Sequence, residues 1–202
     1  MYEAEIKQRV AETAHRCSVQ RLQTGDGGNL SARFGDDRMI VLASRSAFCD
    51  CTEEDFIVTD LNGRPEQEGR RPSRESLLHG AIYARFPDIM AIVHCHSPFA
   101  TAWASTMQPL PIATYHSALK LGGRLKVFDT GDYVVTEPEI SRIVNSYPSD
   151  ACVKGFLLRK HGVFAMGESI DLACCTMELI EETATIGILS KLLTLTDTHS
   201  DL

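Results

Sequence analysis

The stretch MAIVHCHS, residues 90–97, places two histidines in an otherwise apolar segment. The apolar run predicts a buried strand, and side chains along a strand point alternately to its two faces. His94 and His96 are therefore expected to project from one face and Cys95 from the other. Two imidazoles side by side on such a face are unfavourable unless a proton, a hydrogen-bond partner or a metal satisfies their nitrogens. The spacing indicates a divalent-metal site, and the alternative is one core and one surface histidine at the strand end.

A third histidine follows a second apolar segment, FLLRK at residues 156–160. His161-Gly162 comes at the end of this expected strand, where loops often build functional sites. Glycine allows the backbone to come close to a ligand. Taken alone, His161 would be a histidine in solvent. Together with His94 and His96 it makes three protein ligands, which leave a coordination position open as in catalytic zinc sites.

Glu75 lies near the expected start of a helix. Ser73, after Pro72, is expected to cap this helix, which places Glu75 in its first turn. A carboxylate there is commonly only a favourable charge at the helix end. Beside a metal, however, it could be a fourth ligand or a proton shuttle. His79 follows Glu75 by four residues and so shares its helix face, which makes His79 a rival ligand unless packing occupies it.

Outward from these motifs, helices alternate with short strands, with no repeat, linker or low-complexity segment. Residues 107–137 are punctuated by Pro and Gly and are hard to assign. The pattern predicts one α/β domain, residues 1–202, with helices covering a central sheet of undetermined strand order. Helices are expected over residues 3–23, 73–86, 98–106, 137–147 and 169–193, and strands over 30–34, 39–43, 56–59, 90–97, 156–160 and 163–167.

The composition limits the classes of protein and of partner. Of the 202 residues, 44% are hydrophobic and 23% are charged, which is ordinary for a globular protein. This composition excludes a chain that is disordered over most of its length. The net charge of -7 disfavours nucleic acid and anionic membrane surfaces as partners, and no apolar run is long enough to span a bilayer. Arg70, Arg71 and Arg74 form the one dense basic cluster, either a solvated loop or an anion-binding site.

The seven cysteines bear on the compartment. Their number is odd, and the amino-terminal residues are expected to form a charged amphipathic helix rather than a secretory signal. We therefore expect a cytoplasmic protein with reduced thiols.

A glycine-rich stretch, GGNLS at residues 27–31, offers exposed amides that could bind phosphate or carboxylate. The motif is short, and a plain turn is the alternative. Four motifs in this order nevertheless resemble the class II aldolase/adducin family over nearly the whole chain. They are GNLS at residues 28–31, PSRE at residues 72–75, HCHS at residues 94–97, and HG at residues 161–162.

The resemblance implies a three-layer α/β/α sandwich around a largely antiparallel sheet, assembled as a homotetramer with active sites at subunit interfaces. It also assigns roles to individual residues. These are His94, His96, His161 and Glu75 as metal ligands; Glu75 as acid/base; Tyr115 as an acid that crosses to a neighbouring subunit's site; and Gly28, Asn29 and Ser73 as part of the phosphate pocket.

The chain departs from the family pattern at the phosphate pocket. Arg74 stands where a sugar-phosphate aldolase of the family has a second serine, and Ser44-Arg45 stands for its Thr-Gly pair. Arginine pairs with carboxylates and phosphates in a bidentate way that serine cannot reproduce. Ser44, Arg45 and Arg74 are thus expected to bind a carboxylate or a differently placed anion.

The expected function is that of a metal-dependent lyase with Zn²⁺, or another divalent ion such as Mn²⁺ or Co²⁺. The expected reaction is reversible aldol cleavage of a short sugar phosphate or hydroxy-keto acid through a metal-stabilised enediolate, with Glu75 moving the proton. Decarboxylation of a 3-oxo acid, 4-epimerisation and dehydration use the same intermediate and stay open. An adducin-like, non-catalytic interaction domain is the alternative of another class, although such a module has no need of an open metal site.

Overall fold

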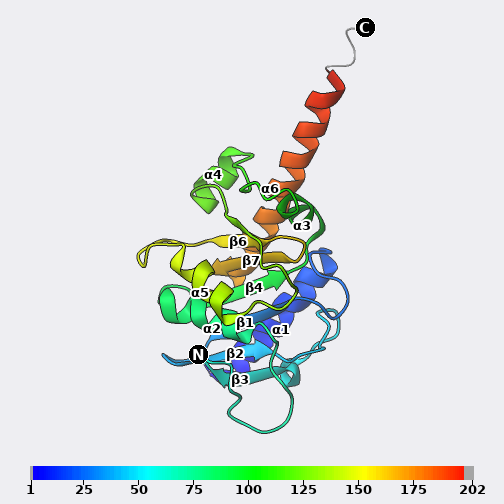
Figure 1. Ribbon diagram of the computed structural model, residues 1–202. Helices are drawn as coiled ribbons and strands as arrows, with labels where there is room; N and C mark the ends of the chain where they lie inside the picture. Colours follow the sequence, from blue (N-terminus) through cyan, green and yellow to red (C-terminus); the bar gives the residue numbers. More distant parts are fainter. Residues whose placement is uncertain (1, 198–202) are drawn as a thin grey trace.

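A computed structural model describes residues 2–197 of the chain (Figure 1). The helices are α1 (Glu3–Val19), α2 (Ser76–Arg85), α3 (Pro98–Ala104), α4 (Tyr115–Leu121), α5 (Glu137–Asn145) and α6 (Ile170–Asp197), with a short 3-10 turn, η1 (Glu53–Asp55). The strands are β1 (Asn29–Arg33), β2 (Arg38–Leu42), β3 (Phe56–Asp60), β4 (Ala91–Cys95), β5 (Val127–Phe128), β6 (Gly155–Leu158) and β7 (Gly162–Gly167).

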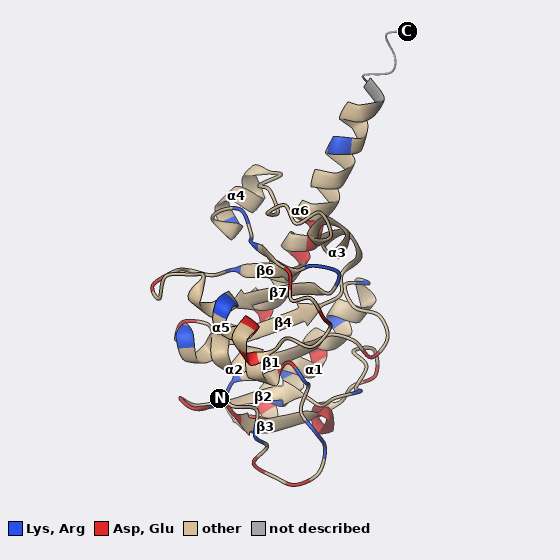
Figure 2. Cartoon of the chain, in the orientation of Figure 1, with Lys and Arg blue, Asp and Glu red and all other residues tan. Residues whose placement is uncertain are grey.

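The strands of residues 2–197 form one seven-stranded sheet in the order β3-β2-β1-β4-β7-β6-β5. Neighbouring strands run antiparallel except β5 and β6, which are parallel. The expectation of a largely antiparallel sheet is therefore confirmed. The central strands β4 and β7 carry no charged residues, whereas basic and acidic residues are spread over helices and loops (Figure 2).

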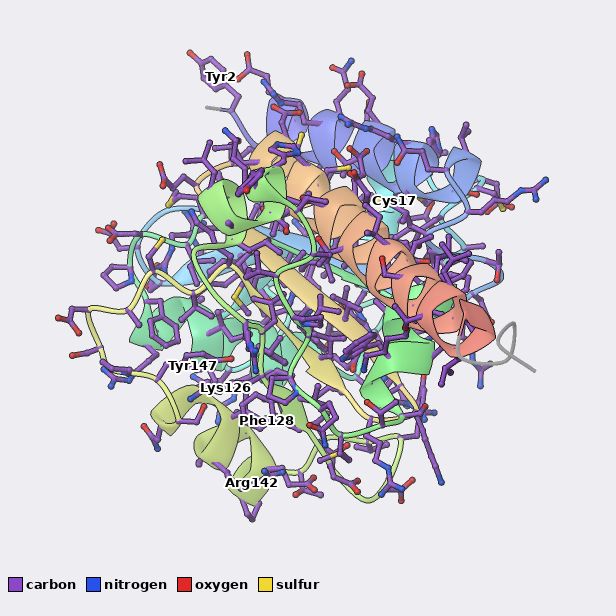
Figure 3. All side chains as sticks on the ribbon, turned by 90° about the horizontal axis from the view of Figure 1, so that it is seen from above. Tyr2, Cys17, Lys126, Phe128, Arg142 and Tyr147 are labelled. Carbon is purple, nitrogen blue, oxygen red and sulfur yellow. The ribbon has the colours of Figure 1, made fainter. Side chains whose placement is uncertain are left out.

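Helices cover both faces of the sheet and produce three layers. On one face, α1, α3 and α6 pack on side chains such as Val93 and Cys95 of β4. On the other face, α2 and α5 pack on Ile92 of β4 and Phe156 of β6. Figure 3 shows α1 and α6 side by side over the sheet, with Cys17 on α1. The predicted α/β/α sandwich is confirmed, because alternate residues of each central strand supply apolar surface to opposite layers.

Most of the predicted elements are present with shifted ends, and the start of α2 is the main correction. The helix begins at Ser76 and Glu75 is its N-cap residue, so the prediction that Ser73 caps the helix is wrong. Ser73 instead begins a preceding turn, in which its carbonyl accepts from the amide of Ser76 at 3.1 Å. This turn moves Glu75 from the first helical turn to the residue just before it.

The unassigned residues 107–137 contain α4 and β5. Thr114 caps α4, because its side chain accepts from the amide of Ser117 at 3.0 Å. Gly122 ends the helix in the left-handed region with φ 71°. A Thr before and a Gly after a seven-residue helix were the signals available in the sequence. Within residues 2–197, no helix combines the length and apolar character needed to cross a bilayer.

The order of the central strands positions the histidines. β4 lies between β1 and β7, and the register pairs His94 with Asn29 on one side and with Phe164 on the other. His161 occupies the turn between β6 and β7, next to Lys160, whose φ is 55°. The start of β1, the end of β4 and the turn between β6 and β7 therefore lie side by side at the same end of neighbouring strands.

Candidate metal centre and adjoining cavity

His94, His96 and His161 converge on one point. One ring nitrogen of each lies within 4.8 Å of the others, and this is the only such group of metal-ligand side chains among the described residues. The Nε2 atoms of His94 and His96 are 3.2 Å apart, and the ring centroids of the three imidazoles are 5.0–5.1 Å apart. The predicted same-face pairing of His94 and His96 is confirmed, and Cys95 lies on the opposite face of the sheet.

The buried ring of His94 has a defined tautomer. Its Nδ1 donates to the carbonyl of Val163 at 2.9 Å, and a carbonyl can only accept. Nε2 of a neutral ring is then unprotonated and directs its lone pair toward His96. Burial lowers the pKa of His94 well below its usual value, and the neighbouring His96 lowers it further. The ring is therefore neutral and available as a ligand.

The other two imidazoles are neutral for the same reason. Burial lowers the pKa of His96. Burial, and next to it the proximity of the His96 ring, lower the pKa of His161 to about 4, because two neighbouring imidazoles would repel each other if both were protonated. Both ring nitrogens of His161 are buried without a hydrogen-bond partner. A buried imidazole with two unsatisfied nitrogens is costly, so a ligand for His161 would remove that cost.

Two glycines allow the close approach of these rings. A Cβ on Gly162 would lie 3.0 Å from Cε1 of His94 and 2.5 Å from the carbonyl of Cys95. Gly28 has φ 70°, and a Cβ there would lie 2.7 Å from the carbonyl of His94. Gly162 thus makes room for the backbone of β4 and for the imidazoles, a packing role in addition to the approach of a ligand expected from the sequence.

Glu75 faces the histidines from the N-terminus of α2. Its Oε2 is 3.1 Å from Nε2 of His94, and its Oε1 is 3.4 Å from Nε2 of His161. Asn29 donates its side-chain amide to Oε2 at 2.6 Å and so orients the carboxyl group. Burial raises the pKa of Glu75 to about 7. Because the pKa values of the imidazoles are lowered and that of Glu75 is raised, these contacts are not ordinary ion pairs.

The four side chains fit a divalent cation. Nε2 of His94 directs its lone pair at Nε2 of His96, and Oε1 of Glu75, which has no hydrogen-bond partner, lies 3.4 Å from Nε2 of His161. Such an arrangement needs a proton or a cation at its centre. Three neutral imidazole nitrogens and a carboxylate oxygen form a donor set that zinc and similar divalent ions accept, and fewer than four ligands keep a position open.

A cavity of about 230 Å³ opens beside Glu75, whose side chain is 12% exposed. Of the four side chains only Glu75 lines this cavity, while His96 is half-buried and His94 and His161 are buried. All six residues expected to bind substrate line this cavity, and substrate binding by them stays a prediction. The lining residues are Asp26, Gly27, Gly28, Asn29, Ala43, Ser44, Arg45, Ser73, Arg74, Glu75, Tyr133, Val134 and Val135.

Two residues named from the sequence lie elsewhere. Tyr115 begins α4, is 98% exposed and does not line the cavity of its own chain. His79, the rival ligand, is fully buried and outside the histidine group. Its Nδ1 and the hydroxyl of Ser31 share a hydrogen bond of 2.7 Å, and that hydroxyl also contacts Tyr83. A packing role therefore occupies His79, and burial lowers its pKa to about 3.

Two residues at the site, Tyr133 and Gln23, were not predicted from the sequence. The ring of Tyr133 lies 5.0 Å from that of His161 and forms part of the cavity wall. Gln23 is buried and accepts a hydrogen bond of 2.7 Å from the backbone amide of His96. Tyr133 lies in the unassigned segment 107–137, and Gln23 lies in the loop after α1, at the end of the helix predicted over residues 3–23. No local pattern distinguishes either residue, because the contacts depend on the tertiary fold.

Comparison with known families identifies the class of protein. The sequence model of the family described as "Class II Aldolase and Adducin N-terminal domain" matches residues 8–188 of the chain. The chain therefore belongs to the class II aldolase and adducin family, as its motifs indicated, and its histidine group is consistent with the divalent-metal site typical of class II aldolases.

Curated relatives include enzymes of different reaction types. The chain is 29% identical over 180 residues to a 5-methylthioribulose-1-phosphate/5-deoxyribulose-1-phosphate aldolase of Rhodospirillum rubrum. The alignment covers 89% of this chain and 78% of the relative. It is 30% identical over 163 residues to a methylthioribulose-1-phosphate dehydratase of Serratia proteamaculans. This alignment covers 77% of this chain and 80% of the dehydratase. Both names describe sugar-phosphate chemistry.

A solved structure supports the same family. The fold matches that of an L-fuculose 1-phosphate aldolase with a TM-score of 0.83 and 27% identity, over 94% of this chain and 87% of the other. The fold is thus that of the class II aldolases.

Proposed function

We propose that this chain is a metal-dependent lyase that reversibly cleaves a carbon–carbon bond in a short sugar phosphate or hydroxy-keto acid. The observation on which the proposal depends is the convergence of three neutral imidazoles and Glu75 next to an open cavity. A binding module of the adducin type has no need of such an arrangement, because unpaired buried nitrogens destabilise a fold without benefit. The relatives named as aldolase and dehydratase support an enzyme.

In this proposal His94, His96, His161 and Glu75 hold the ion, which is Zn²⁺ or another divalent cation such as Mn²⁺ or Co²⁺. When bound, such an ion supplies positive charge beside the substrate oxygens and so stabilises the negative charge that develops as the bond breaks.

Glu75 moves the proton. Its carboxyl group is held by Asn29, and its pKa of about 7 allows it both to accept and to release a proton near neutral pH. The amides and hydroxyls around Gly28, Ser44 and Ser73 bind the anionic end of the substrate. The substrate's reacting carbons then lie between this anion pocket and the histidines.

Decarboxylation of a 3-oxo acid is the second candidate. Arg45 and Arg74 line the cavity, and guanidinium groups grip carboxylates in a bidentate way. An arginine-held carboxylate would suit cleavage at that group. Epimerisation and dehydration use the same proton transfer at Glu75. The seven cysteines, all of them free thiols within residues 2–197, support a reducing compartment such as the cytoplasm.

The test of this function combines metal analysis with a substrate panel. Purified protein should contain about one divalent ion per chain, by inductively coupled plasma mass spectrometry, as expected for a single site. Metal-loaded protein should cleave at least one sugar 1-phosphate or hydroxy-keto acid, and a chelator should abolish the activity. Protein without stoichiometric metal under metal-replete expression would contradict the enzyme proposal and favour an interaction domain.

We also propose a homotetramer in which Tyr115 completes the site of a neighbouring subunit. Its side chain is 98% exposed on a short helix and lies outside the cavity of its own chain. A tyrosine that acts in catalysis from this position has to do so on another copy. In that contact the phenol of Tyr115 would act as a proton donor to the substrate.

Mixed oligomers test the role of Tyr115. We expect the Tyr115→Phe and Glu75→Gln variants each to lose most activity, and their equimolar mixture to recover up to about a quarter of it after subunit exchange, because one interface in four then combines both native residues. Activity assays after co-refolding or co-expression measure the recovery. No recovery from mixed oligomers that exchange subunits would place Tyr115 outside the neighbouring site.

A further inference from the structure

A second cavity, of about 470 Å³, lies against the first on the side of Arg74. The two cavities share three wall residues, Ser44, Arg45 and Arg74. No acidic residue of the described chain lines the second cavity, although the whole chain has a net charge of -7. We call it the arginine cavity, and its lining residues are Ser44, Arg45, Arg70, Arg71, Pro72 and Arg74.

Most of the positive charge in the arginine cavity is not neutralised. Arg70 pairs with the carboxylate of Asp55 and donates to the hydroxyl of Ser46 at 3.2 Å. The guanidinium groups of Arg45, Arg71 and Arg74 make no hydrogen bond or ion pair with any residue of the described chain. The three side chains are exposed, so solvent screens their mutual repulsion, and together they attract an anion to the hollow between them.

The backbone at Arg45 favours another residue. The amide of Ser46 donates to the carbonyl of Ala43 at 3.4 Å, and Arg45 has φ 67° at the third position of this turn. A type II turn of this kind favours glycine there, because a Cβ is strained at positive φ. A cation is thus held at the junction of the two cavities against the local backbone preference. Strained residues of this kind are concentrated at functional sites.

The loops that bear the arginines are tied together. The amide of Ser44 donates to the carbonyl of Arg71 at 2.8 Å, and Ala43 forms an isolated bridge with Pro72. Arg45 and Arg71 therefore extend from two adjoining, hydrogen-bonded segments. Figure 2 shows the basic positions on the long loop that joins β3 to α2.

We propose that the arginine cavity binds a second anionic group of the substrate, a phosphate or a carboxylate, while the amides and hydroxyls of the first cavity bind another. This inference rests on the proposed function in taking the first cavity as the substrate site. Guanidinium groups bind either oxyanion in a bidentate way. The preferred substrates are then doubly anionic, and substrates with a single anionic end bind more weakly.

Calorimetry with unreactive probes tests the proposal on the metal-loaded protein. The probes are propyl phosphate, which has one anionic group, and propane-1,3-diyl bisphosphate and 3-phosphonooxypropanoate, which have two. We expect at least one doubly anionic probe to bind about tenfold more tightly than propyl phosphate, as for one added charge-assisted contact. The probe that gains affinity identifies the second group as phosphate or carboxylate, and a gain by neither overturns the proposal.

A variant of Arg71 tests the second cavity alone, because Arg71 lines the second cavity and not the first. We expect Arg71→Ala to abolish the tenfold advantage of the doubly anionic probe and to leave the binding of propyl phosphate unchanged. Arg64→Ala removes an equal charge from the same loop outside both cavities and should preserve the advantage. Equal weakening of both probes by Arg71→Ala, or equal effects of the two variants, would overturn the proposal.

Arg45→Gly provides a variant that should not impair folding. Glycine relieves the strain at positive φ, so the melting temperature should not fall while the affinity for the doubly anionic probe does. A lower melting temperature with unchanged affinity would contradict the assignment. Because calorimetry needs no turnover, these results stand apart from the substrate panel. A chain inactive on every substrate can still show the second anion site.

Discussion

We expect His94→Ala to lose both its bound metal and its activity. His94 supplies a buried, neutral Nε2 at 3.2 Å from that of His96, and alanine removes it. Loss of a partner that only orients a ligand commonly costs 10–100-fold in metal affinity, so loss of a ligand should cost more than about 100-fold. Activity should fall to the level of chelator-treated wild type. Metal content by mass spectrometry and turnover on the substrate found in the panel measure both effects.

Two further variants separate loss of the ligand from loss of the fold. The ring of His94 stacks on Phe164 at 4.2 Å, so its truncation also leaves a gap in the core. His96 is half-buried and lies after the end of β4, so His96→Ala should lose metal at a smaller cost in stability. His15→Ala, at an exposed histidine on α1, should keep both metal and activity. Metal at the wild-type level in both His94→Ala and His96→Ala would refute the proposed site.

We expect Glu75→Gln to reduce kcat by about 10²–10⁴-fold, the range for loss of a general acid or base. Glutamine matches the shape of glutamate, and its carbonyl oxygen can still accept the hydrogen bond from Asn29. It cannot, however, accept and release a proton near neutral pH. The three imidazoles stay, so most of the metal should too. Steady-state kinetics, metal analysis and the melting temperature distinguish lost catalysis from lost binding.

Asp26→Asn is the matched control for Glu75→Gln. Asp26 is another carboxylate of the same cavity, but it is exposed and forms no hydrogen bond or ion pair with the three histidines. Its replacement should leave kcat nearly unchanged, because an exposed carboxylate is screened by solvent. If Glu75→Gln kept the wild-type kcat, Glu75 would have no part in proton transfer and its role would be limited to orientation or metal binding.

The proposed chemistry depends on how the sheet closes around β4. Asn29 of β1 pairs with His94 and also orients Glu75, so one residue connects the strand that bears the histidines to the helix that bears the acid. Gln23 holds the backbone of His96 from the loop before β1. His94 lies within β4, and His96, His161 and Glu75 lie directly beside the ends of β4, β7 and α2. The ends of regular elements and these buried contacts fix the geometry of the ligands.

The sequence predicted the kinds of element well because their causes are local. The strands expected over residues 30–34 and 39–43 are present as β1 and β2, because each is a short run rich in apolar residues and Gly35 and two aspartates mark a turn between them. The start of α2 was misplaced, because Ser73 is a good capping residue in either a turn or a helix. Pattern alone cannot tell which backbone amide its hydroxyl will meet.

The sequence by itself determined that His94 and His96 share a face, because side chains alternate along any strand whatever surrounds it. It also determined the α/β class and, through the order of its motifs, the family. Only the tertiary structure decided that His161 and Glu75 lie beside that pair and that Tyr133 lines the cavity. It also decided that His79 forms a hydrogen bond with Ser31 and that unpaired arginines surround a second hollow. These contacts join residues tens of positions apart, and they depend on strand order and register. Packing over the whole domain sets that order and register, and no local pattern of residues encodes them.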